Sequence, residues 1–529
     1  MFAKQRIRAI RSQYGKVPEE RYEEEEIRAI RSYYDYRREK EQPSFSLDET
    51  TWYDLSMDRL FERICNTGSA SGEQLLYYQL RCPAVDSEEY QRRYAFLRLA
   101  EDEPELRLKL QVILSRLGKS NAARTAAVFS PSRHKIYRLA IALLLLAGLL
   151  ASMLAFLISH AAFPLFLFVA FLCGNPAYHI AMLRRLEENL PAANYSVALA
   201  AAYYKIRLLD SQRLAACLQP YEQSGKKVRP IARIGAVTLA SSNEIAQIFN
   251  SLFLVDLILY ELLKVELSRL REDIFALHEC IGRLDAAIAA ASYRKSAERF
   301  CDPEICFEKE APSHFAAADM VHPLLKHPVA NTLELTGSLL LTGSNASGKS
   351  TLIKSAALSA ILAQSICTAP CTSYTASAFH IYTSMALEDD ILAGESYFIT
   401  ELKAFRRILS AAARGERVLC AIDEILRGTN TVERIAASST LLEYLAGQPV
   451  LCIAATHDME LCTLLSKTYT LAHFEESIAG DTVAFDYRLR PGPACTRNAI
   501  RLLTLTGFDR VLTAEAEKRA EEYLETGHW

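Results

Sequence analysis

Eight residues in the second half of the chain constrain its fold more than any other feature. They follow the pattern G-x-x-x-x-G-K-S and are Gly343, Ser344, Asn345, Ala346, Ser347, Gly348, Lys349 and Ser350. In such a loop the glycines let backbone N–H groups turn toward an anion, the lysine reaches the outer phosphates, and the serine hydroxyl binds Mg²⁺. An apolar run precedes the loop, and a helical pattern beginning at Thr351 follows it. Strand, loop and helix together predict a phosphate site at a helix N-terminus.

Polar residues follow two further apolar runs in the same half of the chain. The three runs are 339–342, 418–422 and 450–456. They alternate with helical patterns from about residue 306, which predicts a mainly parallel α/β sheet. The carboxyl ends of neighbouring parallel strands form the edge at which such sheets bind ligands. We therefore expect Asp423 to hold Mg²⁺, Glu424 to orient or deprotonate a water, and His457 to sense the γ-phosphate.

A long uncharged stretch is the second strong constraint. No Asp, Glu, Lys or Arg occurs from Leu139 to Pro176. This length suffices for two membrane spans of about 20 residues each. Because 160–164 breaks the stretch near its middle, we expect a helical hairpin at 138–159 and 162–182. Basic residues flank both ends, which predicts that both flanks are cytoplasmic. A hairpin buried in a protein core or an oligomer interface is the alternative.

The net charge and the cysteines place only weak constraints on the function of the chain. The net charge of −3 gives no global electrostatic argument for nucleic-acid binding, so a DNA contact would need a local basic face. The 13 cysteines include no C-x-x-C pair, which favours buried free thiols in a reducing cytosol.

The motifs from about residue 306 onward resemble the ATPase domain of the MutS family, DNA mismatch-repair ATPases related to ABC and SMC ATPases. The phosphate loop carries the asparagine found in the family. G-E-S-Y-F at 394–398 stands where the family has Gly-x-Ser-Thr-Phe, and 422–431 matches Asp-Glu-x-x-Arg-Gly-Thr-x-Thr. Thr456 and His457 match the switch histidine. The segment 322–331 looks like the part that packs near adenine, which adds Val329 to the expected ATP contacts.

This resemblance implies a mechanism with ATP and Mg²⁺ as cofactors. Two ATPase domains would pair head to tail in a homodimer, each completing the other's site. Ser396 would act in trans on the γ-phosphate of the partner. The residues that would act in cis are Lys349, Ser350, Asp423, Glu424 and His457. ATP binding would then tighten the dimer and move a helical lever.

The chain also departs from the family pattern. About 45 residues precede the core, nothing corresponds to the mismatch-reading and connector domains, and no Phe-x-Glu wedge motif lies near the N-terminus. ATP hydrolysis therefore carries over from the resemblance, whereas mismatch recognition does not. Binding of mismatched, branched or damaged DNA is left open. The alternative function is a membrane-tethered nucleotide-gated scaffold or a transporter-type ATPase without DNA binding.

Together these patterns predict a P-loop α/β domain preceded by an all-α lever region that a transmembrane hairpin interrupts. The expected parts are a charged helical arm, a first core segment, the hairpin, a second core segment, and the ATPase domain with a helical tail. Their bounds are 1–43, 44–130, 131–190, 191–305 and 306–529. We expect the protein at the cell membrane, with the ATPase domain and both termini cytoplasmic.

Overall fold

The computed structural model describes residues 2–119, 136–185, 189–238, 244–344, 347–385, 397–426, 429–479, 482–494 and 508–526. The chain forms two compact units. The helical unit comprises Met1–Pro43, Ile64–Gln79 and Arg92–Ser296, and the C-terminal unit comprises Ser44–Arg63, Leu80–Gln91 and Ala297–Trp529. The helical core expected at 44–130 is therefore divided between them.

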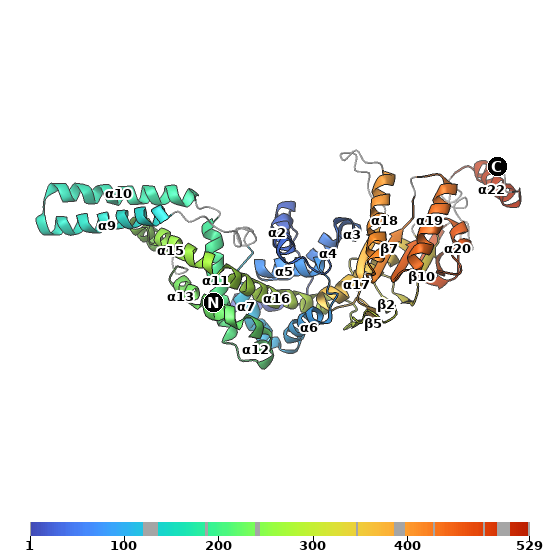
Figure 1. The fold of residues 1–529 in the computed structure, drawn as a ribbon, viewed down its shortest axis with the longest axis horizontal. Helices are drawn as coiled ribbons and strands as arrows, with labels where there is room; N and C mark the ends of the chain where they lie inside the picture. Colours follow the sequence, from blue (N-terminus) through green and yellow to red (C-terminus); the bar gives the residue numbers. More distant parts are fainter. Residues whose placement is uncertain are drawn as a thin grey trace. The chain divides into compact units, whose positions relative to one another are not determined.

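The chain before residue 297 is built from helices, labelled in Figure 1 where there is room. Their bounds are α1 Phe2–Gln13, α2 Glu24–Glu41, α3 Glu49–Asp54, α4 Met57–Ile64, α5 Ala70–Arg81, α6 Ser87–Asp102, α7 Pro104–Leu114, α9 Ile136–Ser159, α10 Ala162–Arg185, α11 Asn189–Arg207, α12 Gln212–Leu218, η2 Gln219–Tyr221, α13 Glu222–Thr238, α14 Glu244–Phe253, α15 Val255–Arg269 and α16 Arg271–Ser296.

Helix α16 forms the buried axis of the helical unit, and Asp285 on it caps α5. The Asp285 carboxylate accepts hydrogen bonds from Ser69 Oγ at 2.5 Å and from the Gly68 N–H at 3.0 Å. A carboxylate at this position also complements the positive end of the α5 dipole. Gly72 permits the close approach, because a Cβ there would lie 2.3 Å from Asp285 Oδ2. The T-G-S-A-S-G run at 67–72 is thus a helix–helix junction.

Helices α9 and α10 form the expected hairpin and pack side by side (Figure 1). Gly148 of α9 lies against the ring of Phe171, since a Cβ there would be 2.4 Å from that ring. The base of the hairpin is held by α14 and α15. Asn175 Nδ2 donates to the Leu252 carbonyl at 2.8 Å, and His179 Nε2 lies 2.9 Å from Asp256 Oδ2.

The structure departs from the local sequence signal in the second core segment. The basic run at 224–230, whose glycine and proline favour a loop, lies inside α13. Packing of α13 against α11 and α16 overrides that signal. The apolar pattern at 243–270 is divided at Leu254, whose φ of 54° separates α14 from α15.

The C-terminal unit carries a mixed sheet of six strands in the order β10-β9-β4-β8-β7-β6. The pairs β9/β4, β4/β8, β8/β7 and β7/β6 are parallel, and β10/β9 is antiparallel. The bounds are β4 Leu339–Thr342, β6 His380–Ser384, β7 Val418–Asp423, β8 Val450–Ala455, β9 Thr470–Ala479 and β10 Thr482–Pro491. The three expected strands and the mainly parallel sheet are confirmed.

A smaller sheet in the order β1-β5-β2-β3 and several helices complete this unit. Their bounds are β1 Glu304–Cys306, β2 Phe315–Met320, β3 Asn331–Leu335, β5 Ser373–Ser377, α17 Lys349–Ile366, α18 Tyr397–Ala413, α19 Thr431–Ala446, α20 Met459–Leu464 and α22 Arg510–Thr526.

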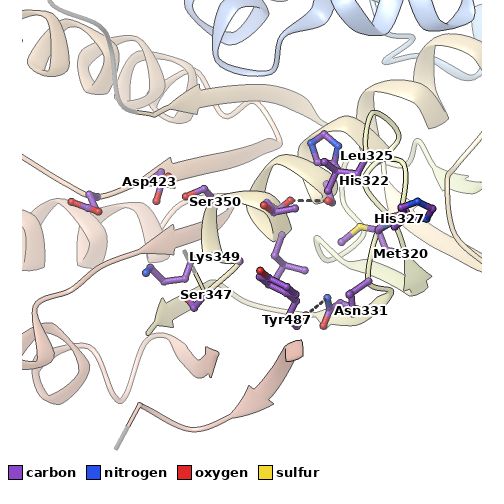
Figure 2. A pocket seen from close by; sticks show the side chains of 17 residues that line it. Met320, His322, Leu325, His327, Asn331, Ser347, Lys349, Ser350, Asp423 and Tyr487 are labelled. Atoms are coloured by element: carbon purple, nitrogen blue, oxygen red, sulfur yellow. Dashed lines mark hydrogen bonds between the residues drawn. The ribbon is translucent and has the colours of Figure 1, made fainter. Parts of the chain in front are cut away.

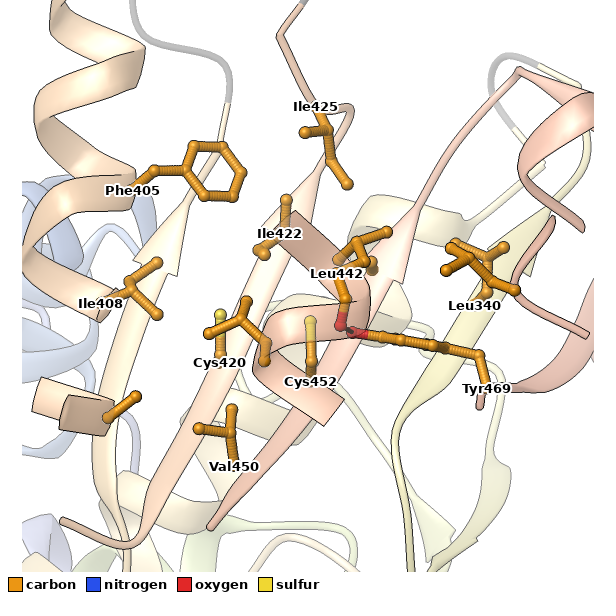
Figure 3. Close-up of a cluster of buried hydrophobic side chains, with 14 of the residues drawn as sticks. Leu340, Phe405, Ile408, Cys420, Ile422, Ile425, Leu442, Val450, Cys452 and Tyr469 are labelled. Atoms are coloured by element: carbon orange, nitrogen blue, oxygen red, sulfur yellow. Dashed lines mark hydrogen bonds between the residues drawn. The ribbon is translucent and has the colours of Figure 1, made fainter. Parts of the chain in front are cut away.

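The side chains packed against the larger sheet show which helices cover its faces (Figure 3). Cys420 and Ile422 of β7 pack with side chains of α18, α19 and α20 on one face of the sheet. Because side chains alternate along a strand, the buried Leu419 and Ala421 point to the other face, and α17 contacts β7. The sheet is thus covered on both faces, as expected for parallel strands. This arrangement holds the carboxyl ends of β4 and β7 at the same end of the sheet.

Candidate functional site

The phosphate loop connects β4 to α17 through two glycines that no other residue could easily replace. Gly343 has a φ of 139° and Gly348 a φ of 109°, both in the region that favours glycine. A Cβ on Gly343 would also meet the Phe474 carbonyl oxygen at 2.9 Å. Helix α17 begins at Lys349, and the Leu352 N–H donates to the Gly348 carbonyl. The helix N-terminus therefore opens directly onto the loop.

A cavity of about 420 Å³ lies against this loop (Figure 2). Most of the residues expected to bind ATP and Mg²⁺ line it, namely Val329, Ser347, Gly348, Lys349, Ser350, Thr351, Asp423 and Glu424. Gly343 and Ser344 lie beside it, and their carbonyls each accept a hydrogen bond from Lys349 Nζ at 2.8 Å. Asn345 and Ala346 lie outside the described residues.

The acidic pair stands at the carboxyl end of β7. Asp423 is the last strand residue and pairs with Ala455 of β8. Glu424 leaves the strand with a φ of 57°, a conformation that few non-glycine residues adopt and that often marks functional sites. Its N–H donates to the Ala455 carbonyl at 3.0 Å. The turn thus holds both carboxylates in the wall of the cavity.

His457 contacts one of these carboxylates. Its Nε2 lies 3.1 Å from Glu424 Oε1. We expected His457 to sense a γ-phosphate. The structure instead places it in contact with Glu424, the residue expected to activate water. In the tautomer with hydrogen on Nε2, the imidazole donates to the Glu424 carboxylate and fixes its orientation.

The cavity lining also contains a residue that the sequence did not point to, Tyr487 on β10, which lies beside Gly348 of the phosphate loop. The register between β9 and β10 shifts between Phe485 and Leu489, and Tyr487 has a φ of 54° within this irregularity. Asn331 holds the backbone of this irregular stretch at two points. Its Nδ2 donates to the Tyr487 carbonyl, and its Oδ1 accepts from the Leu489 N–H. Bulges often redirect a side chain next to a site. No local sequence signal marks this contact, because it depends on pairing between distant segments.

His322 also lines the cavity and carries no charge near neutral pH. Burial, with a smaller effect from the nearby Lys354 ammonium, lowers the pKa of His322 to about 4. Its Nδ1 accepts a hydrogen bond from the Leu324 N–H. The part of the lining around His322 therefore combines a neutral imidazole with apolar side chains such as Met320 and Leu325 (Figure 2). Such a lining suits an uncharged aromatic ring better than a phosphate.

The lining fits a nucleoside triphosphate with Mg²⁺. Ser350 and Asp423 offer a hydroxyl and a carboxylate oxygen, the hard ligands that Mg²⁺ prefers. Lys349 and the N-terminus of α17 offer positive charge beside them. Ser396, expected to act in trans, lies outside the described residues, as do the rest of 386–396 and Arg427. Helix α18 begins at Tyr397, immediately after that segment.

Comparison with known proteins identifies this domain. Residues 339–524 match the family model described as MutS domain V. The chain therefore carries a MutS-family domain. Over 189 residues, 34% of this chain, it is 33% identical to the "DNA mismatch repair protein MutS 2" of Haloarcula marismortui. Over 252 residues, 44% of this chain, it is 31% identical to the "MutS protein homolog 4" of Mus musculus.

The matched part is limited to a fraction of these MutS proteins. The alignments span 20% of the Haloarcula protein and 26% of the mouse protein. MutS domain V is a P-loop ATPase-type α/β domain, and the C-terminal unit has that architecture after a helical region. The resemblance inferred from the motifs is therefore confirmed for the family and for the class of this domain.

Proposed function

We propose that this chain is a Mg²⁺-dependent ATPase that binds ATP in the cavity at the phosphate loop and couples its hydrolysis to movement of the helices before residue 297. The observation that supports this most directly is the cavity itself. It brings Lys349 and Ser350 of the loop together with Asp423 and Glu424 at the carboxyl end of β7. These are the groups that phosphoryl transfer needs for positioning and for charge stabilisation.

Each residue has a distinct role in the proposed reaction. Lys349 would exchange its two loop carbonyls for phosphate oxygens. Mg²⁺ on Ser350 and Asp423 would offset phosphate charge. Glu424, oriented by His457, would take a proton from a water whose oxygen bonds to the γ-phosphorus. The bond from that phosphorus to the bridging oxygen breaks, which releases ADP and phosphate.

Phosphate release by the purified protein tests this proposal. Glu424→Gln keeps the size of the side chain but removes the base, and we expect the rate to fall about 100-fold or more. Glu443→Gln is the matched control, because Glu443 is an exposed residue of α19 outside the cavity lining. Lys349→Ala should abolish ATP binding. Equal rates for the parent and Glu424→Gln would end the catalytic proposal and leave the nucleotide-gated scaffold.

A head-to-tail homodimer with Ser396 acting in trans is part of the proposal. It is supported by the family resemblance of 394–398, and MutS-family proteins generally work as dimers. Lys349→Ala and Ser396→Ala should each be inactive alone. Mixed subunits should regain roughly a quarter of the parent rate, since half of the dimers are mixed and each has one complete site. No recovery in subunits shown to exchange would rule out the trans role.

Membrane anchoring through the α9–α10 hairpin is a further part of the proposal. Tyr137–Ser159 and Ala162–Arg185 are long and apolar enough to cross a bilayer, and only 17% of the most apolar window of each is buried. The protein should stay in the membrane fraction after a carbonate wash, and deletion of 138–182 should release it. Release of the full chain by carbonate would favour a hairpin buried in a protein core or an oligomer interface over a lipid anchor.

DNA binding is a second candidate activity, suggested by the relatives named above. A basic contact surface would make such binding strongly salt-dependent. Binding of branched or mismatched duplex at low salt that is lost on addition of ATP would support a repair-like role. No binding at low salt would leave the chain an ATPase without DNA.

A further inference from the structure

Helix α3 is attached to the larger sheet of the C-terminal unit through buried polar contacts. Asp54 at its end accepts hydrogen bonds from Thr383 Oγ1 at 2.6 Å and from the Met385 N–H at 3.1 Å. Thr51, one turn earlier, accepts from the Thr383 N–H at 3.2 Å. These contacts hold α3 against the end of β6, the edge strand beside β7.

Arg407 of α18 joins the same cluster from a third element. Its guanidinium donates to Asp48, the N-cap residue of α3, and to the Thr383 carbonyl. It also donates to Thr51 Oγ1 at 3.2 Å. The cluster therefore ties α3 to both β6 and α18, and β6 and α18 flank the segment 386–396 in the chain.

A second cavity, of about 810 Å³, separates α3 and α4 from the part of the nucleotide site expected to hold the metal. One side is lined by α3 and α4 residues that include Trp52, Asp54 and Asp58. The other side includes Ser350 and Asp423, which also line the first cavity. The two residues expected to ligate Mg²⁺ thus form a wall shared by both cavities.

We infer that α3 senses the occupancy of the metal-binding corner, and that Asp54 and Thr51 are positioning residues that pass this state to the helices that follow. The inference rests on the proposed ATPase function, and it assigns the coupling to one contact. Covalent continuity carries the effect onward, because α3 and α4 lead through residue 64 into α5. Asp54 touches none of the residues expected to react.

The chemistry of Asp54 suits a contact that changes with the nucleotide state. Burial raises the pKa of its carboxyl, with Thr383, the Met385 N–H and Arg407 opposing that rise. A buried carboxylate held by a few donors is costly to displace but loses little packing when it moves. The neighbouring cavity gives α3 room to shift without creating a clash.

Tryptophan fluorescence can test this inference directly, because the chain has only two tryptophans. Trp52 lies in α3, where its Nε1 donates to Asp58 Oδ1 at 2.9 Å and Arg81 stacks over its ring. In a Trp529→Phe background all tryptophan emission therefore comes from α3. Addition of Mg²⁺ and a slowly hydrolysed ATP analogue should shift this emission.

Two matched substitutions separate the contact from its surroundings. Thr51→Val removes the hydroxyl that binds Thr383 and Arg407, whereas Thr50→Val makes the same change one position away on the same helix. We expect Thr51→Val and Asp54→Asn to lose the emission shift and to lower kcat about tenfold, with the Kd of the analogue changed less than about twofold. Thr50→Val should match the parent in all three readouts.

The outcomes also distinguish failure of this inference from failure of the proposed function. If Glu424→Gln abolishes hydrolysis but Thr51→Val and Asp54→Asn keep both the emission shift and kcat, coupling through α3 is wrong and the ATPase proposal stands. If the parent neither binds nor hydrolyses ATP, the proposed function fails first. Should Asp54→Asn not fold, Thr51→Val decides alone, with thermal unfolding as the check on its fold.

Discussion

Two buried aspartates join helices to their neighbours in the two units, and they do so in different surroundings. Asp285 in the helical unit is sealed between α16 and the start of α5, with Gly72 in direct contact. Asp54 in the C-terminal unit faces a cavity of about 810 Å³. Burial raises the pKa of both carboxyls. A carboxylate sealed in this way keeps its hydrogen-bond partners and acts as a fixed clamp between two helices, whereas a carboxylate beside a cavity can exchange partners. Burial alone therefore does not distinguish a fixed contact from a movable one.

The largest expected effect tests the sealed junction. Gly72→Ala would place a methyl group 2.3 Å from Asp285 Oδ2, and Ser69 and Gly68 prevent that carboxylate from moving away. We expect the free energy of unfolding of the helical unit to fall by about 3 kcal/mol. Far-UV circular dichroism during urea unfolding measures this loss. Gly174→Ala is the control, since its Cβ would meet nothing within 4 Å. Similar midpoints for the two variants would show that the junction is not tight.

A pH series with Asp285→Asn gives the next effect. Burial raises the pKa of Asp285 to about 6, so between pH 4 and 6 the folded state keeps a proton that the unfolded state has lost. The parent's free energy of unfolding should therefore fall by about 2 kcal/mol relative to Asp285→Asn as the pH rises through this range. The pKa of His278, which burial lowers to about 3, affects both proteins alike. A constant difference across the range would mean that Asp285 is not a clamp buried from water.

The smallest effect is expected at the second junction. Asp54→Asn keeps one oxygen acceptor for Thr383 or Met385, and the adjoining cavity lets α3 adjust. We expect the free energy of unfolding of the C-terminal unit to fall by only about 1 kcal/mol. Trp52 emission during urea unfolding follows that unit. A loss as large as that of Gly72→Ala would place Asp54 among fixed clamps and weaken its proposed role in coupling.

Local patterns were enough to predict the parts of the fold that depend on neighbours in sequence. Each strand end that bears a proposed site residue follows an apolar run, and the phosphate loop needs only its own glycines. Helices α9 and α10 were equally predictable, because a long run without charged residues indicates apolar helices without reference to the rest of the chain. Pairing between distant segments was not visible. The β10 irregularity that aims Tyr487, the break at Leu254 and the attachment of α3 to β6 all depend on contacts between residues far apart in the chain.

The hydrogen bonds from Lys349 to the Gly343 and Ser344 carbonyls carry a consequence for ligand discrimination. The ammonium is already satisfied by its own loop, so an incoming ligand gains only the difference between the phosphate contacts and the carbonyl contacts it displaces. Under the proposed ATP-binding function, a monophosphate too short to reach Lys349 would leave these hydrogen bonds intact and gain nothing from the lysine. The loop would then discriminate between phosphate chains by their length, because only a chain that reaches the ammonium would replace the loop carbonyls as its partners.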